Sequence, residues 1–387
     1  MTDLLNEALA LSGELAALRH AFHAEPALGN REFRTAEKIE NCLRACGIPT
    51  RRLLDTAVIG RLDGAEGGPC AALRADMDAL PLQEDTGAFF ASKTPGVMHA
   101  CGHDVHMAAV LGAARLLSTR RGDLRGSVAF IFQPDEEGRG GAQRLIDAGA
   151  LEGVDAVFGA HVSPELPLGH VGVRYGKFYA ASDTFRVAVK GKSAHGAERE
   201  KGVDALAAAA RMVTAVLALP ENLPGEKSVV SVGTMRAGTA ENILADRAEF
   251  AGIIRTLGPA ARKEMRARFG KAVEALSDET GAAVECAIRE SYPGVVNDEG
   301  MTRLVEQAAC AALGGGRVHS IASPTMTTED FGCFLQVRPG SYYHIGAGCA
   351  LPLHNPRFLP DDEAAVIGAA VHAAIVEAFF HGEAVST

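Results

Sequence analysis

Short apolar runs that end in polar residues alternate along the chain with helical patterns such as 104–118, 140–151 and 361–380. The apolar runs predict buried strands. Near-continuous apolar strands that alternate with helices are typical of a largely parallel sheet covered on both faces. The four predicted strands are CAALRAD (70–76), SVAFIFQ (127–133), AVFGAHV (156–162) and SYYHIGAG (341–348).

The middle of the chain has a different pattern, in which half-exposed strands alternate with two longer helices. One helix, 202–219, ends at Pro220, and the other, 259–281, opens with Pro259. Together with four strands they give the order βαββαβ, the ferredoxin-like split unit. We therefore expect an α/β fold whose larger domain, 1–180 and 293–387, is interrupted by an antiparallel-sheet α+β domain, 181–292. The strands expected there are 183–191, 228–238, 243–257 and 283–292.

Composition narrows the classes of protein. A chain of 387 residues exceeds one compact core, which agrees with two domains. The formal net charge of -10 argues against a nucleic-acid partner. The first residues lack the features of a signal peptide, and we expect no segment long and apolar enough to cross a bilayer. The eight cysteines are expected as thiols, so a cytoplasmic location is predicted.

Candidate chemistry gathers where the four buried strands end. In open α/β sheets, ligands bind beyond the carboxyl ends of the strands. We therefore expect side chains from separate segments to meet at this edge of the sheet. They are Asp76, Asp78, Asp135, Glu136, Glu137, His161 and His354, with Cys101 and His103 just ahead of the helix 104–118.

Each of these clusters has an ordinary structural interpretation when it is taken alone. PDEEG is typical of a solvated acidic turn, His161 of a hydrogen-bonded core histidine, and His354 of a loop residue. CGHDVH resembles half of a structural zinc site, but the sequence offers no C-x-x-C partner for it. All four interpretations would have to hold together at one edge of the sheet, so the sequence favours a metal site.

The mixed set of donors restricts the metal. Thiolate, imidazole and carboxylate together suit zinc, manganese, cobalt or nickel and disfavour magnesium and calcium. Five candidate ligands exceed the needs of one tetrahedral ion, so two ions are expected, as in aminopeptidase-type hydrolysis. Adjacent Glu136 and Glu137 on a non-helical segment point different ways. One can bind metal while the other takes a proton from water, and the residues alone leave open which does which.

Several motifs run in order through nearly the whole chain. They are RHAFHAEPALGNREFRTAEKI (19–39), LRADMDALP (73–81), MHACGHDVHMA (98–108), FQPDEEG (132–138), GAHV (159–162), SAHG (193–196), ENIL (241–244), TEDF (328–331) and LHNP (353–356). This set resembles the M20 metallopeptidase/amidohydrolase family, in its branch of aminoacylases, hippurate hydrolases and auxin-conjugate hydrolases. The resemblance implies a mostly parallel di-metal catalytic α/β domain with an inserted ferredoxin-like lid. Ala27 and Asn30 stand where family members often carry Glu and a bulkier residue.

Carried over position by position, the resemblance implies a role for each catalytic-domain residue. Glu136 becomes the general base that activates water. Asp78 becomes an acid beside the metal centre that orients the ligands. His99 and His106, the spare histidines of the third motif, are expected to support the ligands or to pack. The implied metal ligands are Cys101, His103, Glu137, His161 and His354.

The lid contributes three further residues by the same resemblance. His195 would polarise the scissile carbonyl, and Asn242 and Arg255 would meet the carboxylate of the substrate. The planar guanidinium of Arg255 suits that group, although an exposed strand arginine is the alternative.

The expected activity is hydrolysis of the amide bond in an N-acyl amino acid by two divalent transition ions. The expected partners are a small-molecule substrate and a second copy bound through the lid, without nucleic acid or membrane. A dipeptidase or a deacetylase of the N-acetyl-diaminopimelate type shares the metal motifs and is the nearest alternative. A non-catalytic metal-binding scaffold would be expected to have lost Glu136, and metal ligation would withdraw Cys101 from thiol chemistry.

Overall fold

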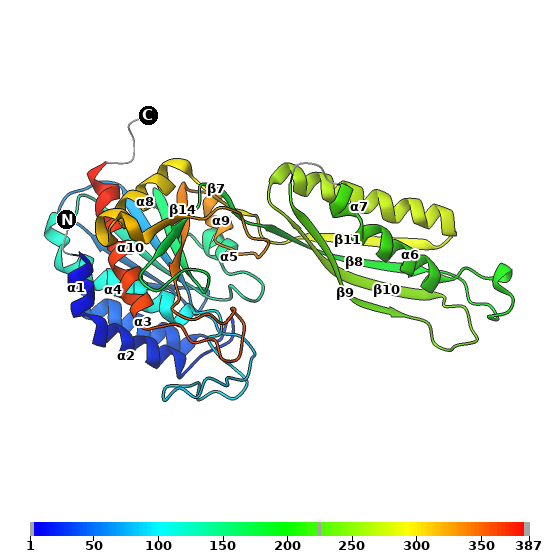
Figure 1. The fold of residues 1–387 in the computed structure, drawn as a ribbon, viewed down its shortest axis with the longest axis horizontal. Coiled ribbons are helices and arrows are strands. Elements are labelled where there is room, and N and C mark those ends of the chain that lie inside the picture. The colour runs from blue at the N-terminus through cyan, green and yellow to red at the C-terminus, as the bar shows by residue number, and fades with distance from the viewer. Residues whose placement is uncertain (1–3, 223–225, 383–387) are drawn as a thin grey trace. The chain divides into compact units, whose positions relative to one another are not determined.

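The computed structural model describes residues 4–222 and 226–382, which form two compact units (Figure 1). The first unit comprises Met1–Gly176, Val296–Ala322 and Asp330–Thr387. The second unit comprises Lys177–Val295 and Ser323–Glu329. The short segment 323–329, which the sequence assigns to the larger domain, therefore falls in the second unit.

The first unit is built on an eight-stranded sheet with the order β1-β2-β4-β3-β5-β14-β6-β13. The four central strands, β4, β3, β5 and β14, are parallel to one another. They are the four apolar runs of the sequence, and almost every residue in them is buried, as expected for strands covered on both faces. The bounds are β1 (Thr50–Leu53), β2 (Ala57–Asp63), β3 (Cys70–Asp76), β4 (Ser127–Gln133), β5 (Ala156–Ser163), β6 (Val171–Val173), β13 (Val318–Ser320) and β14 (Gly340–Gly346).

Helices cover this sheet unequally. The long helices α4 and α10 pack on each other over β3, β5 and β14, with α8 beside α10 and with α1 and α2 outside them. On the opposite face, Phe331 stacks on Tyr342 of β14 with ring centroids 4.7 Å apart, next to α5 and α9. The bounds are α1 (Leu4–Ala10), α2 (Ser12–His23), α3 (Phe33–Ala45), α4 (His103–Thr119), α5 (Ala142–Asp147), α8 (Glu299–Leu313), α9 (Gly332–Leu335) and α10 (Glu363–His381).

Helix α10 corrects one expectation from the sequence. Among the described residues it is the one helix that is long and apolar enough to cross a membrane, so the expectation that no segment reaches that length is wrong. Residues 364–376 of this helix are all buried, because α1, α4 and α8 surround it. Its composition is therefore that of a core helix.

The second unit has the predicted βαββαβ order, with a four-stranded antiparallel sheet in the order β11-β8-β10-β9. Apolar side chains of β8 and β10, such as Phe185 and Phe250, pack against Met212 of α6 and Phe269 of α7 to form a separate core. The bounds are β8 (Ala181–Lys190), α6 (Ala205–Leu217), β9 (Ser228–Ala237), β10 (Arg247–Thr256), α7 (Pro259–Thr280) and β11 (Ala283–Glu290).

The remaining elements are short. They are the strands β7 (Gly176–Tyr179) and β12 (Val295–Asn297) and the 3-10 turns η1 (Arg121–Asp123), η2 (Arg199–Lys201), η3 (Leu219–Asn222) and η4 (Gly315–Arg317).

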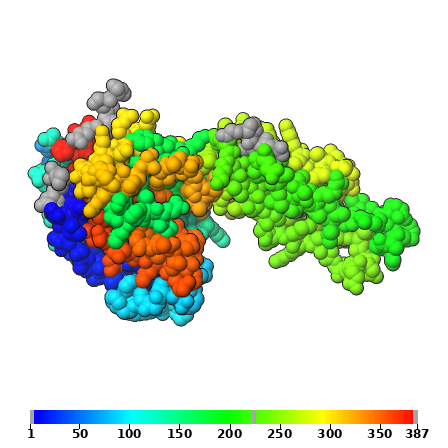
Figure 2. All heavy atoms as spheres, viewed as in Figure 1, coloured from blue at the N-terminus to red at the C-terminus, as the bar shows by residue number. Residues whose placement is uncertain are grey.

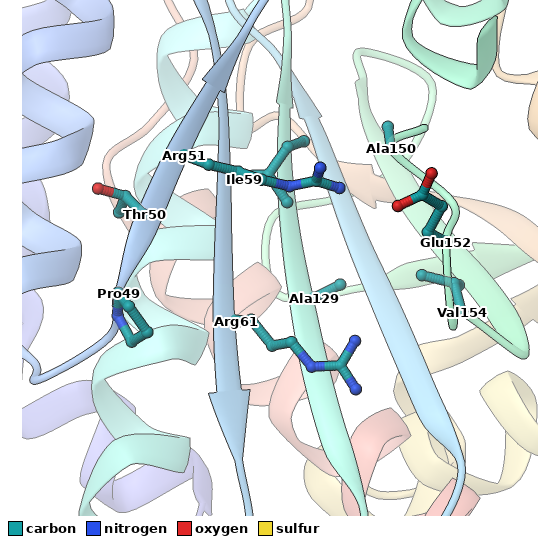
Figure 3. Close-up of a pocket in the computed structure, with 9 residues that line it drawn as sticks. All are labelled: Pro49, Thr50, Arg51, Ile59, Arg61, Ala129, Ala150, Glu152 and Val154. Carbon is teal, nitrogen blue, oxygen red and sulfur yellow. The ribbon is translucent and has the colours of Figure 1, made fainter. Parts of the chain in front are cut away.

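The first unit has two notable surface features, a contact between two loops and a cavity. The loop at residues 85–95 adjoins the segment near residue 355 (cyan beside orange-red in Figure 2), and the amide of Asp85 donates to the carbonyl oxygen of Pro356 at 2.8 Å. A cavity of about 240 Å³ lies elsewhere, over the strands β1, β2 and β4. Figure 3 shows Ile59 and Ala129 in its wall and the guanidinium groups of Arg51 and Arg61 at its sides. None of the predicted site residues lines this cavity.

Candidate metal centre

The predicted ligands of the first unit come together beyond the carboxyl ends of the parallel strands. Three of the donor groups at this edge contain two or more of them, and within each group the donor atoms lie within 4.8 Å of one another. The groups are Cys101, His103 and His161; Cys101, Glu137 and His354; and His103, Glu136 and Glu137.

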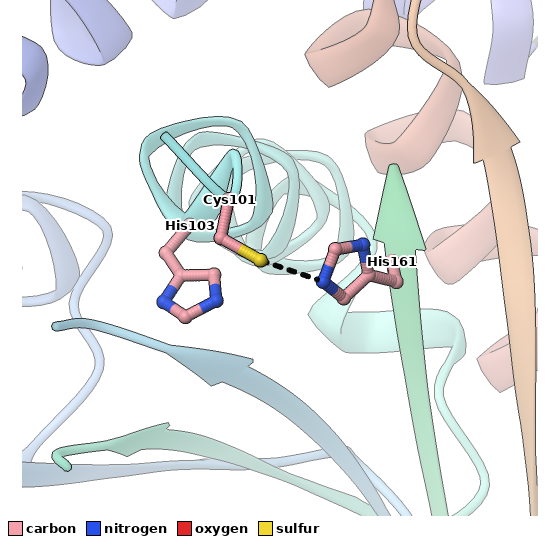
Figure 4. Close-up of side chains that lie close together, drawn as sticks. All are labelled: Cys101, His103 and His161. Atoms are coloured by element: carbon pink, nitrogen blue, oxygen red, sulfur yellow. Dashed lines mark hydrogen bonds between the residues drawn. The ribbon is translucent and has the colours of Figure 1, made fainter. Parts of the chain in front are cut away.

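The first group depends on a glycine at the start of α4. Gly102 has a φ of 86°, and a Cβ at this position would lie 2.4 Å from Cγ2 of Val162. Only glycine tolerates both the conformation and the close approach. The resulting turn places Cys101 Sγ 3.3 Å from His161 Nε2 and His103 close by (Figure 4).

Backbone carbonyl groups orient both imidazoles of this group. His103 Nδ1 lies 2.8 Å from the carbonyl oxygen of Asp78, and His161 Nδ1 lies 2.7 Å from that of Val162. A carbonyl oxygen only accepts, so each Nδ1 carries a proton, and in the neutral ring this leaves the Nε2 lone pair for a metal. Nε2 of His103 is buried and has no hydrogen-bond partner among residues 4–222 and 226–382. This is the arrangement in which a histidine ligates a metal.

The electrostatics of the site also fit a bound cation. Burial and the carboxylates of Glu137 and Glu136 raise the pKa of the Cys101 thiol well above its ordinary value. Burial alone would lower the pKa of His103, but Asp76 and Asp78 raise it to about 10. The carboxylates thus give the site a negative potential, which favours a bound positive charge. A thiol, two imidazoles and carboxylates in such a field suit divalent transition ions.

Asp78 holds the segment that carries the two glutamates. Its Oδ1 accepts the amide N–H of Glu136 at 3.1 Å, and its Oδ2 accepts the amide N–H of Glu137 at 3.0 Å. Glu137 Oε1 in turn lies 3.1 Å from His354 Nε2. Asp78 Oδ1 also lies 3.5 Å from Nδ1 of His103, so the expected supporting acid contacts both the backbone of the acidic segment and a predicted ligand side chain.

A buried polar network lies behind the predicted ligands, and the sequence did not predict the part that Arg74 and Asp330 play in it. Arg74, fully buried, donates to Asp76 at 2.6 Å and to Asp330 at 3.0 Å. Asp76 lies 2.6 Å from Nδ1 of His106, whose Nε2 accepts the amide N–H of Val162 at 2.9 Å. Burial opposes ionisation of Asp76, but His103 and Arg74 hold its pKa well below the ordinary value.

The two spare histidines of the third motif differ in their surroundings. His106 supports the end of β5, where His161 stands, through the amide of Val162. His99 has no hydrogen-bond partner for either ring nitrogen within the described residues, and burial lowers its pKa to about 3. It is therefore a neutral packing residue.

The three predicted residues of the second unit fall into two places. His195 and Asn242 are neighbours, because His195 bridges to Ile243 and the amide of Gly196 donates to the carbonyl oxygen of Asn242 at 2.8 Å. They lie beyond the end of the sheet at which Arg247 pairs with Lys190.

Arg255 lies towards the other end of the same sheet, opposite Ser182. At about 3.4 Å per residue, the eight positions from Arg247 along β10 place it about 27 Å from the Arg247 end. Its buried Nη1 atom has no hydrogen-bond partner among residues 4–222 and 226–382, and burial lowers its pKa. An incompletely paired guanidinium is suited to a bound anion.

A largely buried set of thiol, imidazole and carboxylate donors at the carboxyl edge of a parallel sheet, with an adjacent pair of glutamates, defines a metal-dependent hydrolase. Residues 72–378 match the model of peptidase family M20/M25/M40, and the chain belongs to this family. The predicted family and the predicted fold are both confirmed.

Relatives of known name share this family likeness. The N-acetylcysteine deacetylase of Bacillus subtilis is 38% identical over 357 residues, which cover 91% of this chain and 93% of the relative. The N-acyl-L-amino acid amidohydrolase of Geobacillus stearothermophilus is 39% identical over 295 residues, 75% and 80% of the two chains. A crystal structure of a dinuclear metal-binding M20 peptidase from Bacillus subtilis superposes with a TM-score of 0.87 at 34% identity, covering 97% of this chain and 99% of that one.

Proposed function

We propose that this protein is a metal-dependent hydrolase that cleaves the amide bond of N-acyl amino acids and releases a carboxylate and a free amino acid. The division between Glu136 and Glu137 is the observation that carries the proposal. Both glutamates share a donor group with His103, but only Glu137 also shares one with Cys101 and His354, and Asp78 binds the backbone amides of both. The deacetylase and the amidohydrolase among the relatives support this class of substrate.

The proposed metal ligands are the five that the sequence indicates: Cys101, His103, Glu137, His161 and His354. Two of the donor groups overlap at Cys101, and a single tetrahedral ion needs only four ligands, which supports two divalent ions. The thiol among the donors favours manganese, zinc, nickel or cobalt over magnesium or calcium.

When bound, the ions would polarise the substrate carbonyl and lower the pKa of a water molecule. Glu136 accepts a proton from that water as its oxygen attacks the carbonyl carbon, and the same carboxyl group then gives the proton to the amine as the C–N bond breaks. His195 donates to the oxygen on which negative charge develops. Asp78 keeps Glu136 in place throughout, because its carboxylate holds the backbone of that residue.

Recognition of the substrate carboxylate falls to Asn242 and Arg255 in this proposal. A small N-acyl amino acid is too short to reach both residues in one copy of the second unit, since about 27 Å of strand separates their ends of the sheet. This separation supports a homodimer formed through the second unit, in which Arg255 comes from one copy and the His195–Asn242 pair from the other.

Mixing two inactive variants tests the shared site. In a mixed dimer of H195A and E136Q, one site combines an intact Glu136 with an intact His195 only if His195 acts across the interface. Activity that returns on mixing supports the dimer. A mixture that remains as inactive as either parent, with mixed dimers demonstrated by mass spectrometry, places His195 in its own copy.

The activity itself is tested with a panel of N-acetyl, N-benzoyl and indole-acetyl amino acids and unblocked dipeptides. Metal-loaded protein should hydrolyse N-acyl amino acids, lose this activity with a chelator and regain it with metal. Cleavage of dipeptides alone would make the protein a dipeptidase, and no cleavage of any amide would reject the proposal. We also propose a cytoplasmic location, which the eight free thiols support.

A further inference from the structure

Glu32 is a buried acid outside the metal centre, in the RHAFHAEPALGNREF motif for which the resemblance gives no residue role. It is 0% exposed and stands at the N-cap of α3, yet its side chain does not cap that helix. Its Oε1 instead accepts two backbone N–H groups, that of Asn30 at 3.0 Å and that of Asp135 at 3.1 Å.

Through the second of these hydrogen bonds, Glu32 holds the same backbone segment that Asp78 holds. Asp78 accepts the amide N–H groups of Glu136 and Glu137, and Glu32 accepts that of Asp135. Three consecutive amides of the acidic segment 134–138 therefore point at two buried carboxylates. Burial raises the pKa of Glu32 to about 7, and the nearby charge of Asp78 acts in the same direction. A carboxyl group in either protonation state still has an oxygen that accepts an N–H.

The backbone at this point needs to be held. Asp135 has a φ of 60° and Asn30 a φ of 62°, both in the left-handed region that residues other than glycine seldom adopt. Such conformations persist when the surroundings fix them. Arg144 adds a second tie, since its Nη1 donates to Asn30 Oδ1 at 2.8 Å and to Asp135 Oδ2 at 3.3 Å.

Close packing adds to these hydrogen bonds, and together they form a clamp between the turn at residues 27–32 and the acidic segment 134–138. A Cβ at Gly29 would lie 2.2 Å from Oδ1 of Asp135, and one at Gly138 would lie equally close. The side chain of Asp135 therefore fits between two glycines, one from each segment. The turn at residues 27–32 and the acidic segment are thus locked together by hydrogen bonds, an ion pair and shape.

We propose that Glu32 is a positioning residue of the hydrolytic reaction, which fixes the backbone at Asp135 and thereby aims Glu136 and Glu137. It touches neither the metal ligands nor the substrate in this role. The kinetic part of the inference rests on the proposed function, whereas the structural part does not.

The test compares Glu32→Ala with Glu32→Gln. The glutamine keeps an oxygen that accepts both N–H groups, whereas alanine removes it. Thr35→Ala is the matched control, because Thr35 is 1% exposed in the first turn of the same helix and makes no hydrogen bond to residues 134–138 in the described part of the chain. Arg144→Ala, at an exposed residue, tests the clamp from outside should Glu32→Ala fail to fold.

Hydrogen exchange of the metal-free proteins is the first readout. Loss of the bond to Asp135 should speed exchange in peptides covering 134–138 by about 10-fold in Glu32→Ala and by a smaller factor in Arg144→Ala. The affinity for Zn²⁺, measured by competition with a chromogenic chelator, should fall by about 10-fold in Glu32→Ala, because Glu137 is no longer aimed. Glu32→Gln and Thr35→Ala should stay within about twofold of the parent in both measurements.

Kinetics with metal-loaded protein are the second readout. In Glu32→Ala, kcat should fall by about 10-fold or more while KM changes less than about twofold, since Glu32 does not bind substrate. The inference is overturned if Glu32→Ala matches the parent in exchange and Zn²⁺ affinity, if Thr35→Ala loses as much, or if glutamine is as harmful as alanine. A parent that hydrolyses no N-acyl amino acid, while exchange and Zn²⁺ affinity change as expected, rejects the proposed function and leaves the positioning role supported.

Discussion

The buried pair of His23 and Asp104 gives a prediction about stability and pH. His23 is 0% exposed, with Nδ1 2.9 Å from Asp104 and Nε2 3.2 Å from Glu84. Burial alone would lower the pKa of His23, but the two carboxylates raise it to about 9 from its ordinary 6.5. The imidazolium in the folded protein is therefore stabilised relative to the unfolded chain.

The size and sign of the effect follow from this shift. At about 1.4 kcal/mol per pKa unit, the pair contributes about 3 kcal/mol to the free energy of unfolding. Because the folded pKa is the higher one, this stability is fully present below pH 6.5. It is lost as the pH rises through 9, where folded His23 releases its proton.

Replacing His23 with glutamine isolates the contribution, since the amide is polar but does not titrate. Urea unfolding followed by circular dichroism, with metal removed, should be measured for parent and variant at pH 6.0 and 9.5. Between these values the parent should lose about 3 kcal/mol more than His23→Gln. Titrating groups remote from the pair, including His103, are common to the two proteins and cancel in the difference. Parallel pH dependence of the parent and the variant would refute an imidazolium at this position.

Four further substitutions test the site. Glu136→Gln should keep Zn²⁺ binding while kcat falls by about 10²–10⁴, and Glu137→Gln should weaken Zn²⁺ binding and recover some activity with added metal; the reverse pattern, seen by chelator competition, would exchange the two roles. Arg255→Ala should raise KM for free-carboxylate substrates much more than for their amides, and equal effects in steady-state assays would remove it from carboxylate binding. Gly102→Ala, forced against Val162, should lower both Tm and Zn²⁺ affinity, and an unchanged Zn²⁺ titration would contradict the packing seen at the turn.

The central part of the fold was predictable because its strands are buried on both faces. A parallel strand between two helical layers has almost no polar positions, so 70–76 and 127–133 stand out in the sequence. The edge strands do not: β1 and β13 are three or four residues long and partly exposed, and their patterns resemble loops. Helix α5 is shorter than the predicted 140–151, since it ends before Gly149, which has a φ of 83°.

The candidate ligands were predictable for a related reason. A strand end fixes where its next residues lie, and thiol, imidazole and carboxylate groups are distinctive in type. The supporting network has neither advantage. Arg74 and Asp330 are 256 residues apart in the sequence, and the local pattern around each does not indicate its partner. The TEDF motif shows that an acid is present, but not that Asp330 accepts the amides of Gly141 and Ala142.

The backbone around the second donor group is held to other segments of the chain by hydrogen bonds. Two left-handed residues occur there, Asp135 next to the glutamate pair and His354, itself a proposed ligand, with φ of 60° and 63°. Each conformation costs on the order of 1–3 kcal/mol. Each is also tied to another segment, since Glu32 binds the amide of Asp135 and the amide of His354 donates to the carbonyl oxygen of Ala100 at 2.8 Å. Ala100 directly precedes Cys101, so this bond links two segments that carry proposed ligands. The strain at Asp135 and His354 is thus offset by hydrogen bonds and packing within the first unit.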